Sequence, residues 1–249
     1  MEFRKDFFER LKTAKNILFF TGAGISAESG IATFRGKDGL WNKLKPEELA
    51  NFNAFMKNPD MVWEWYQYRR EIINETKPNL GHYTIVEFEK YFEKVDVVTQ
   101  NVDNLHGRAG SSSIYELHGN IERNFCVDCK TFYNKEDLLG SEKVPRCTKC
   151  NGLIRPDVVW FGEMLPAGVF EKSEQLAMNS DITFVVGTSA VVYPAAYIPI
   201  SAKQGGAYVV EINLDGTEIS GSVDYSLRGK SGEILPEILN IIKEQKGAV

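Results

Sequence analysis

Two pairs of cysteines are the residues whose spacing most directly predicts chemistry in this chain. Each pair has the pattern Cys-x-x-Cys, and 17 residues separate the pairs. This spacing is typical of ribbons in which four thiolates bind one Zn²⁺ ion, whereas four unliganded core cysteines would have no reason to pair twice at this interval. Because four protein ligands leave no open position for a substrate, we expect the zinc to be structural. The predicted ligands are Cys126, Cys129, Cys147 and Cys150.

A glycine-rich turn follows the apolar run 17–21 and is the second chemical signal. Residues 22–27 fit the G-x-G-x-x-G/A pattern of dinucleotide-binding turns, with alanine in the last place. The first glycine can make the tight turn, the second lets the backbone approach a pyrophosphate, and the small last residue lets helix pack on strand. An ordinary strand-to-helix turn has the same pattern, so that alternative stays open. The residues concerned are Gly22, Ala23, Gly24, Ser26 and Ala27.

Polar residues stand where further apolar segments end. Gln100 is the last residue of the run 95–100, and Asn101 and Asp103 follow it directly. His118 lies just ahead of the cysteine pairs. We expect them near the carboxyl ends of parallel strands, where such sheets bind ligands. The structural alternatives are a satisfied core histidine, a turn asparagine and a helix-capping aspartate, and a capping role can coexist with a functional one. The other two histidines have no such context and are expected to be structural: His82 and His106.

Apolar patterning predicts the elements that position these residues. Buried parallel strands are expected at Ile17–Thr21, Val95–Gln100, Ile182–Val186 and Tyr208–Ile212. Helices are expected at Phe3–Thr13, Met61–Ile73, His82–Tyr91 and around Ile234–Lys243. Their alternation predicts an α/β fold with a mainly parallel, doubly wound sheet. Residues 123–154 interrupt this rhythm and are expected to form an inserted module around the cysteines.

Composition narrows the class of protein. A chain of 249 residues with 43% hydrophobic residues is long enough for a large core, so folding needs no disulfides. No apolar run approaches the length of a membrane span, and no export signal is visible, so we expect a cytoplasmic protein. The formal net charge of -5 gives no general attraction to nucleic acid, and direct nucleic-acid binding is not expected.

Taken in order, these motifs resemble those of the sirtuins. The matching stretches run from residue 22 to residue 213: Gly22-Ala23-Gly24-Ile25-Ser26, Ser29-Gly30-Ile31, Phe34-Arg35-Gly36, Gln100-Asn101-Val102-Asp103, Leu117-His118-Gly119, the cysteine pairs, Gly187-Thr188-Ser189 and Ile212-Asn213. The resemblance implies a Rossmann-like NAD-binding domain, residues 1–122 and 155–249, with a helical or loop insertion at about 28–80. It also implies a zinc-ribbon module at 123–154, with NAD and an acyl-lysine protein substrate in the cleft between them.

The resemblance further implies the reaction. The acyl oxygen attacks C1′ of the nicotinamide ribose and nicotinamide leaves; an imidate then rearranges and hydrolyses to free lysine and O-acyl-ADP-ribose. His118 would take a proton from a ribose hydroxyl, for which an imidazole titrating near physiological pH is suited. Asn101 and Asp103 would orient nicotinamide, ribose and a bound water, and Gln100 would hold ribose hydroxyls. These side chains would replace the acid that dinucleotide-binding turns usually have about 20 residues on, which is missing here.

Further NAD contacts are implied in four places. Phe34 and Arg35 would lie in the loop over the nicotinamide pocket, and Trp41 is also expected to contact NAD. The phosphates and the adenosine would be met by Gly187, Thr188 and Ser189, and by Asn213, Leu214 and Asp215, respectively. Ser231 is assigned to the adenine pocket, although the family usually has a small apolar residue there.

Tyr66 and Arg69 indicate which acyl group is removed. They lie three apart on the predicted helix 61–73 and so share a face. A phenol and a guanidinium together suit a carboxylate, and the pair matches the Tyr-x-x-Arg motif of sirtuins that remove succinyl and malonyl groups. The alternative is a helix with core aromatics and solvated arginines. The segment expected to pair with the substrate backbone is Val159, Trp160, Phe161 and Gly162.

Three other functions are alternatives to deacylation. The same base and pocket would serve ADP-ribosyl transfer to a protein acceptor, which product analysis would separate. A nicotinamide-dependent dehydrogenase lacks visible hydride-accepting chemistry. A non-enzymatic zinc-ribbon module would bind partners without NAD and would be unaffected by changing His118.

Overall fold

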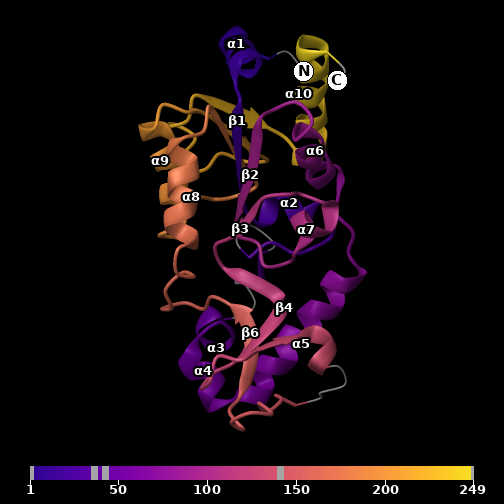
Figure 1. Ribbon diagram of the computed structural model, residues 1–249, viewed down its shortest axis with the longest axis vertical. Helices are drawn as coiled ribbons and strands as arrows, with labels where there is room; N and C mark the ends of the chain where they lie inside the picture. The colour runs from indigo at the N-terminus through magenta and orange to yellow at the C-terminus, as the bar shows by residue number, and fades with distance from the viewer. Residues whose placement is uncertain (1–2, 35–38, 41–44, 139–142, 248–249) are drawn as a thin grey trace.

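The computed structural model describes residues 3–34, 39–40, 45–138 and 143–247. It has a large parallel sheet above and a smaller antiparallel sheet below, with helices around both (Figure 1). In this part of the chain, no helix is long and apolar enough to cross a bilayer.

Six parallel strands form the large sheet, in the order β3-β2-β1-β7-β8-β9. Their bounds are β1 Asn16–Thr21, β2 Lys94–Thr99, β3 Ile114–Glu116, β7 Ile182–Val186, β8 Tyr208–Asn213 and β9 Tyr225–Arg228. The four central strands were predicted, and the doubly wound parallel sheet is confirmed. Because the chain leaves β1 toward β2 on one side and later returns to β7 on the other, the carboxyl ends of these strands flank a switch point suited to ligands.

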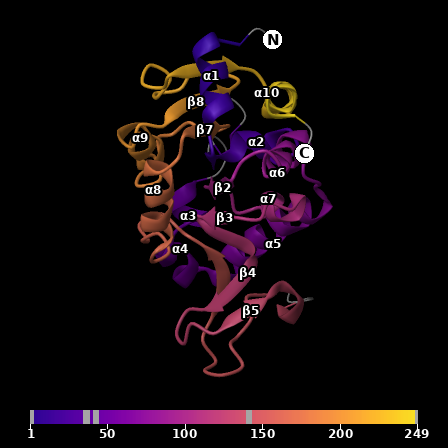
Figure 2. The ribbon, with the colours of Figure 1, turned by 45° about the horizontal axis from the view of Figure 1, so that its top comes forward.

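Helices cover both faces of this sheet (Figure 2). One face is packed by α1 Lys5–Thr13, α6 Leu80–Phe88 and α10 Ser231–Lys246, and the other by α8 Val169–Met178 and α9 Tyr197–Gln204. Phe19 belongs to the first core and its neighbour Phe20 to the second, as the two-residue period of a strand requires. Two short helices, α2 Ala23–Ala27 and α7 Leu105–Ala109, follow β1 and β2 at their carboxyl ends.

The smaller sheet has the order β5-β4-β6 and is antiparallel. Its strands are β4 Gly119–Cys126, β5 Phe132–Asn134 and β6 Ile154–Val158, with a 3₁₀ turn, η2, at Lys135–Leu138. Beside it lie α3 Pro46–Leu49, α4 Phe52–Lys57 and α5 Pro59–Glu75, and α4 and α5 share a buried cluster with β4 and β6. This sheet runs from residue 119 to residue 158, whereas the predicted zinc-ribbon module covers residues 123–154. The strand bounds alone do not define a domain, so the domain boundaries stay a prediction.

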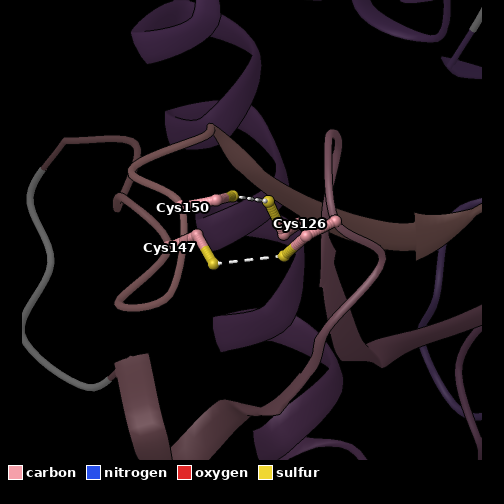
Figure 3. Close-up of side chains that lie close together, drawn as sticks. Cys126, Cys147 and Cys150 are labelled. Atoms are coloured by element: carbon pink, nitrogen blue, oxygen red, sulfur yellow. Dashed lines mark hydrogen bonds between the residues drawn. The ribbon is translucent and has the colours of Figure 1, made fainter.

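The four cysteines meet at the end of the smaller sheet, and Figure 3 labels Cys126, Cys147 and Cys150. All four sulfurs lie within 4.8 Å of one another, with Cys126 Sγ 3.4 Å from Cys150 Sγ and Cys129 Sγ 3.5 Å from Cys147 Sγ. Four thiolates about 2.3 Å from one zinc ion are about 3.8 Å apart in a tetrahedron. The cluster therefore fits a structural Zn²⁺, as its spacing predicts.

Removing zinc is expected to unfold the smaller sheet. Cys150→Ser, or a strong chelator, should lower the free energy of unfolding by on the order of several kcal/mol, because the free energy of zinc binding contributes to the stability of the folded site. Thermal melts and metal analysis would measure this effect, and added Zn²⁺ should reverse that of the chelator. The assignment would be contradicted if the purified protein held no zinc, had four titratable thiols and kept the same melting temperature when Zn²⁺ was added.

Two glycine turns touch backbone to backbone at the carboxyl ends of β1 and β7. The Gly24 amide donates to the Gly187 carbonyl at 2.7 Å, and the Gly22 amide donates to the Val186 carbonyl at 3.0 Å. A Cβ atom on Gly24 would lie 2.6 Å from Gly187 Cα, and Gly187 has a φ of +59°. Both positions therefore require glycine because of this contact, a reason that the dinucleotide pattern alone does not contain.

Gly187→Ala should be strongly destabilising, because its Cβ would lie 2.4 Å from the Ile25 amide nitrogen. Gly206 is the matched control, since its φ is +88° but nothing lies within 4 Å of its Cβ position. Both variants bear the cost of a left-handed backbone, and Gly187→Ala should cost about 1–3 kcal/mol more from overpacking. Urea denaturation would measure the difference, and equal losses would show that the contact is unimportant.

Candidate functional site

A cleft of about 1040 Å³ lies between the large sheet and the smaller one. Its size is at the upper end for a small-molecule site, which suits a dinucleotide together with a peptide side chain. Most of the predicted site residues line it: Gly22, Ala23, Gly24, Ala27, Phe34, Tyr66, Arg69, Gln100, Asn101, His118, Val159, Trp160, Phe161, Gly162, Gly187, Thr188, Ser189, Asn213, Leu214, Asp215 and Ser231. Arg35 and Trp41 lie outside the described residues, and Ser26 and Asp103 are buried behind the lining.

The Asn101 side chain ties β2 to the glycine turn after β1. Its Nδ2 donates to the Gly22 carbonyl and to Ser26 Oγ, both at 3.1 Å. Its backbone amide donates to Thr99 Oγ1 at 3.0 Å. Asn101 therefore supports the turn that would face a pyrophosphate while also lining the cleft.

Asp103 lies one layer deeper. Its carboxylate accepts from the Leu105 amide at 2.9 Å, at the start of α7, and also interacts with the Ser26 hydroxyl. Burial raises the pKa of this carboxyl, while the Leu105 amide, Ser26 and the charge of Arg69 oppose that rise. The predicted capping role is thus present, although the N-cap position itself belongs to Asn104.

Thr188 links three strand ends. Gln100 Nε2 donates to Thr188 Oγ1 at 2.9 Å, and Asn213 Nδ2 donates to the Thr188 carbonyl at 3.0 Å. The side-chain oxygen of Asn213, Oδ1, accepts from the Leu214 backbone amide at 3.0 Å. The residues assigned to ribose, phosphates and adenosine are therefore one hydrogen-bonded group across β2, β7 and β8.

His118 is oriented by Gln100, the residue directly after β2. Its Nδ1 lies 3.0 Å from the Gln100 carbonyl oxygen. Because a carbonyl only accepts, Nδ1 of the neutral ring carries the proton and Nε2 is the basic nitrogen. The His118 carbonyl accepts from the Val159 amide at 2.9 Å, which joins the base to the segment expected to pair with substrate.

His82 and His106 are buried away from the cleft lining, as expected for structural histidines. Burial lowers the pKa of His82 to about 4 and that of His106 well below its usual value. His106 Nε2 lies 2.9 Å from Thr21 Oγ1, behind the sheet end that carries Asn101.

Tyr66 and Arg69 both reach the cleft from α5. The Arg69 guanidinium lies over two rings, 4.7 Å from the centroid of Phe34 and 5.1 Å from that of Trp65. Among the described residues, no carboxylate forms a salt bridge with Arg69, and burial lowers its pKa although Tyr66 and Asp103 act in the opposite direction. Burial raises the pKa of Tyr66, so that its hydroxyl stays protonated. The face predicted from the three-residue spacing is therefore present.

Ser231 lies at the start of α10 and is held by an acid. Its hydroxyl donates to Glu28 Oε1 at 2.6 Å, and the Gly232 amide donates to the same carboxylate at 3.1 Å. Glu28 follows α2, so this contact joins the turn near β1 to the side of the cleft predicted to hold the adenosine. Ser231 is buried and lines the cleft, but its hydroxyl is already used.

Several lining residues were not predicted: Glu28, Trp65, Asn79, Leu80, Val192 and Tyr193. Trp65 is four residues before Arg69 on α5, so helical spacing was a signal that would have found it. Glu28 contacts residues more than 200 positions away, and no local pattern predicts such a contact.

Comparison with known proteins identifies the family. The Sir2 family model matches residues 22–194. An NAD-dependent protein deacylase of Pyrococcus furiosus is 52% identical over 229 residues, covering 90% of this chain and 92% of that protein. NAD-dependent protein deacylase 2 of Pyrobaculum aerophilum is 50% identical over 235 residues, covering 94% of each.

Solved structures agree with these relatives. A mutant Sir2 homologue in complex with ADP-ribose has a TM-score of 0.93 at 43% identity and covers 97% of both chains. A Sir2 homologue–NAD complex has a TM-score of 0.91 at 44% identity, covering 98% of this chain and 95% of that one. The resemblance seen in the motifs is therefore confirmed, and the chain belongs to the Sir2 family.

Proposed function

We propose that this protein is an NAD-dependent protein-lysine deacylase that removes acetyl groups and also succinyl or malonyl groups, releasing nicotinamide and O-acyl-ADP-ribose. The observation that carries the proposal is the cleft itself, in which an oriented imidazole, a glycine turn and a buried Tyr–Arg pair face one space. The names of the relatives, NAD-dependent protein deacylases, support the general activity. A Sir2 structure with p53 peptide and NAD⁺ supports a peptide substrate in such a cleft.

Each part of the cleft has a role in this reaction. Bound NAD supplies the ribose carbon that accepts the acyl oxygen. His118 would receive a ribose hydroxyl proton at Nε2, while Nδ1 keeps its own proton and donates it in a hydrogen bond to the Gln100 carbonyl oxygen. The segment from Val159 to Gly162, held to His118 by one backbone hydrogen bond, would add to the substrate backbone as a strand.

Acyl selectivity would come from α5. The Arg69 guanidinium, stacked on two aromatic rings and largely removed from water, would attract a terminal acyl carboxylate strongly. An acetyl group has no such carboxylate and would need only the apolar part of the pocket. The same cleft can therefore serve both substrates.

Replacing His118 tests the base. His118→Ala should lower NAD-dependent deacylation by about 10²-fold or more, because the ribose hydroxyl loses its proton acceptor. Mass spectrometry of an acetyl-lysine peptide and assay of nicotinamide would measure it, with a thermal melt to confirm folding. A folded variant with undiminished rate would contradict the role. NAD cleavage without a change in peptide mass, in the wild type, would favour ADP-ribosyl transfer instead.

Replacing Arg69 tests the acyl preference. Arg69→Met should lower kcat/KM for a succinyl-lysine peptide by about 10- to 100-fold, because a charge-assisted hydrogen bond is lost. The kcat/KM for the acetyl peptide should stay within a few-fold of the wild-type value. Arg70→Met is the matched control, because Arg70 is also buried on α5 but donates to the Ile121 carbonyl and to Asn124. It should affect both peptides equally. Parallel losses in the Arg69 variant would sink the proposed preference.

A further inference from the structure

A buried hydrogen bond joins the proposed acyl pocket to the proposed substrate strand. Trp160 Nε1 donates to the Tyr66 hydroxyl oxygen at 2.8 Å, and each residue is only 1% exposed. An indole N–H can donate but cannot accept. The Tyr66 oxygen must therefore be the acceptor in this pair, and its own proton has to point elsewhere.

The direction left for that proton is the cleft. Among the residues that the structure describes, no acceptor for the Tyr66 hydroxyl is found, and Tyr66 lines the cleft beside Arg69. Burial keeps the phenol neutral, so that it retains a proton to donate. Donation from the indole also makes the phenol a stronger donor, because hydrogen bonds in a chain polarise one another.

The indole itself is fixed by an ion pair that no catalytic step uses. Glu163 Oε2 accepts from the Trp160 backbone amide at 2.8 Å and from Arg155 at 2.9 Å. The Cζ atom of Arg155 lies 3.3 Å from the centroid of the Trp160 ring, and the guanidinium donates to the Val158 carbonyl at 2.7 Å. The Trp160 ring also packs on Phe55, 5.3 Å between centroids. These contacts hold the indole N–H toward Tyr66.

We propose that Trp160 is a positioning residue for acyl specificity: its indole N–H makes the Tyr66 hydroxyl a hydrogen-bond donor to the carboxylate of an acidic acyl group. The inference rests on the proposed function, in which Tyr66 and Arg69 bind that carboxylate. It adds that selectivity for acidic acyl groups depends on a side chain that does not touch the carboxylate. Acetyl-lysine, which has no terminal acceptor, should be insensitive to this hydrogen bond.

A double-mutant cycle tests the proposal. Trp160→Phe removes the N–H and keeps an aromatic ring, and it should lower kcat/KM for a succinyl-lysine peptide by about fivefold to tenfold, the effect of one hydrogen bond. Because Trp160 also lies in the proposed substrate strand, both activities can fall, so the readout is the ratio of succinyl to acetyl kcat/KM, which should fall by the same roughly fivefold to tenfold. In a Tyr66→Phe background, Trp160→Phe should have no further effect on this ratio.

The control is Trp63→Phe. Trp63 is also fully buried, but it packs beside the cysteines and does not line the cleft. Its replacement should change both activities by the same factor. Should Trp160→Phe fail to fold, Glu163→Gln replaces it, because this change weakens the hold on the indole and leaves both hydrogen-bonding side chains in place. Its succinyl-selective loss must likewise vanish in the Tyr66→Phe background.

The outcomes distinguish a failure of the proposed acyl preference from a failure of the proposed role of Trp160. If Tyr66→Phe and Arg69→Met do not lower succinyl activity selectively, the acyl preference is wrong and the inference falls with it. If they do, but the effect of Trp160→Phe persists unchanged without the Tyr66 hydroxyl, Trp160 acts through packing and only the inference is overturned. A selective loss that disappears in the Tyr66→Phe background is the result that we expect.

Discussion

The contact between the turns after β1 and β7 is the constraint on which the rest of the site depends. With Gly24 donating to the Gly187 carbonyl at 2.7 Å, the turns after the two central strands are in direct backbone contact and leave no room for a Cβ atom on either glycine. That approach places Thr188 within reach of Gln100 and Asn213. One steric requirement thereby brings together side chains from three strands, and these side chains line the cleft.

Two hydrogen bonds then fix the position of His118 relative to these strand ends and to the proposed substrate strand. The Gln100 carbonyl selects the tautomer of His118, and the His118 carbonyl holds the segment that begins at Val159. From that segment, Trp160 reaches Tyr66 on α5. The imidazole, the proposed substrate strand and the proposed acyl pocket are therefore linked through a series of hydrogen bonds along one short segment of the chain.

The central sheet and the zinc ligands were predictable because their signals are local. Strands buried on both faces are continuous apolar runs, and the cysteine spacing is set by two tight turns. The outer strands β3 and β9 were missed because they have only three and four residues and are mostly half-buried. Tyr66 and Arg69 followed from helical spacing, whereas the Trp160 contact joins residues 94 positions apart and has no sequence signal. The cytoplasmic location stays a prediction.

The stoichiometry of products is the most direct test of the account. The purified protein, incubated with NAD and an acyl-lysine peptide, should yield one nicotinamide and one O-acyl-ADP-ribose for each lysine freed, as measured by mass spectrometry of all species in one sample. Free acetate or succinate formed without NAD consumption, or ADP-ribose attached to protein in place of O-acyl-ADP-ribose, would contradict the proposed deacylation.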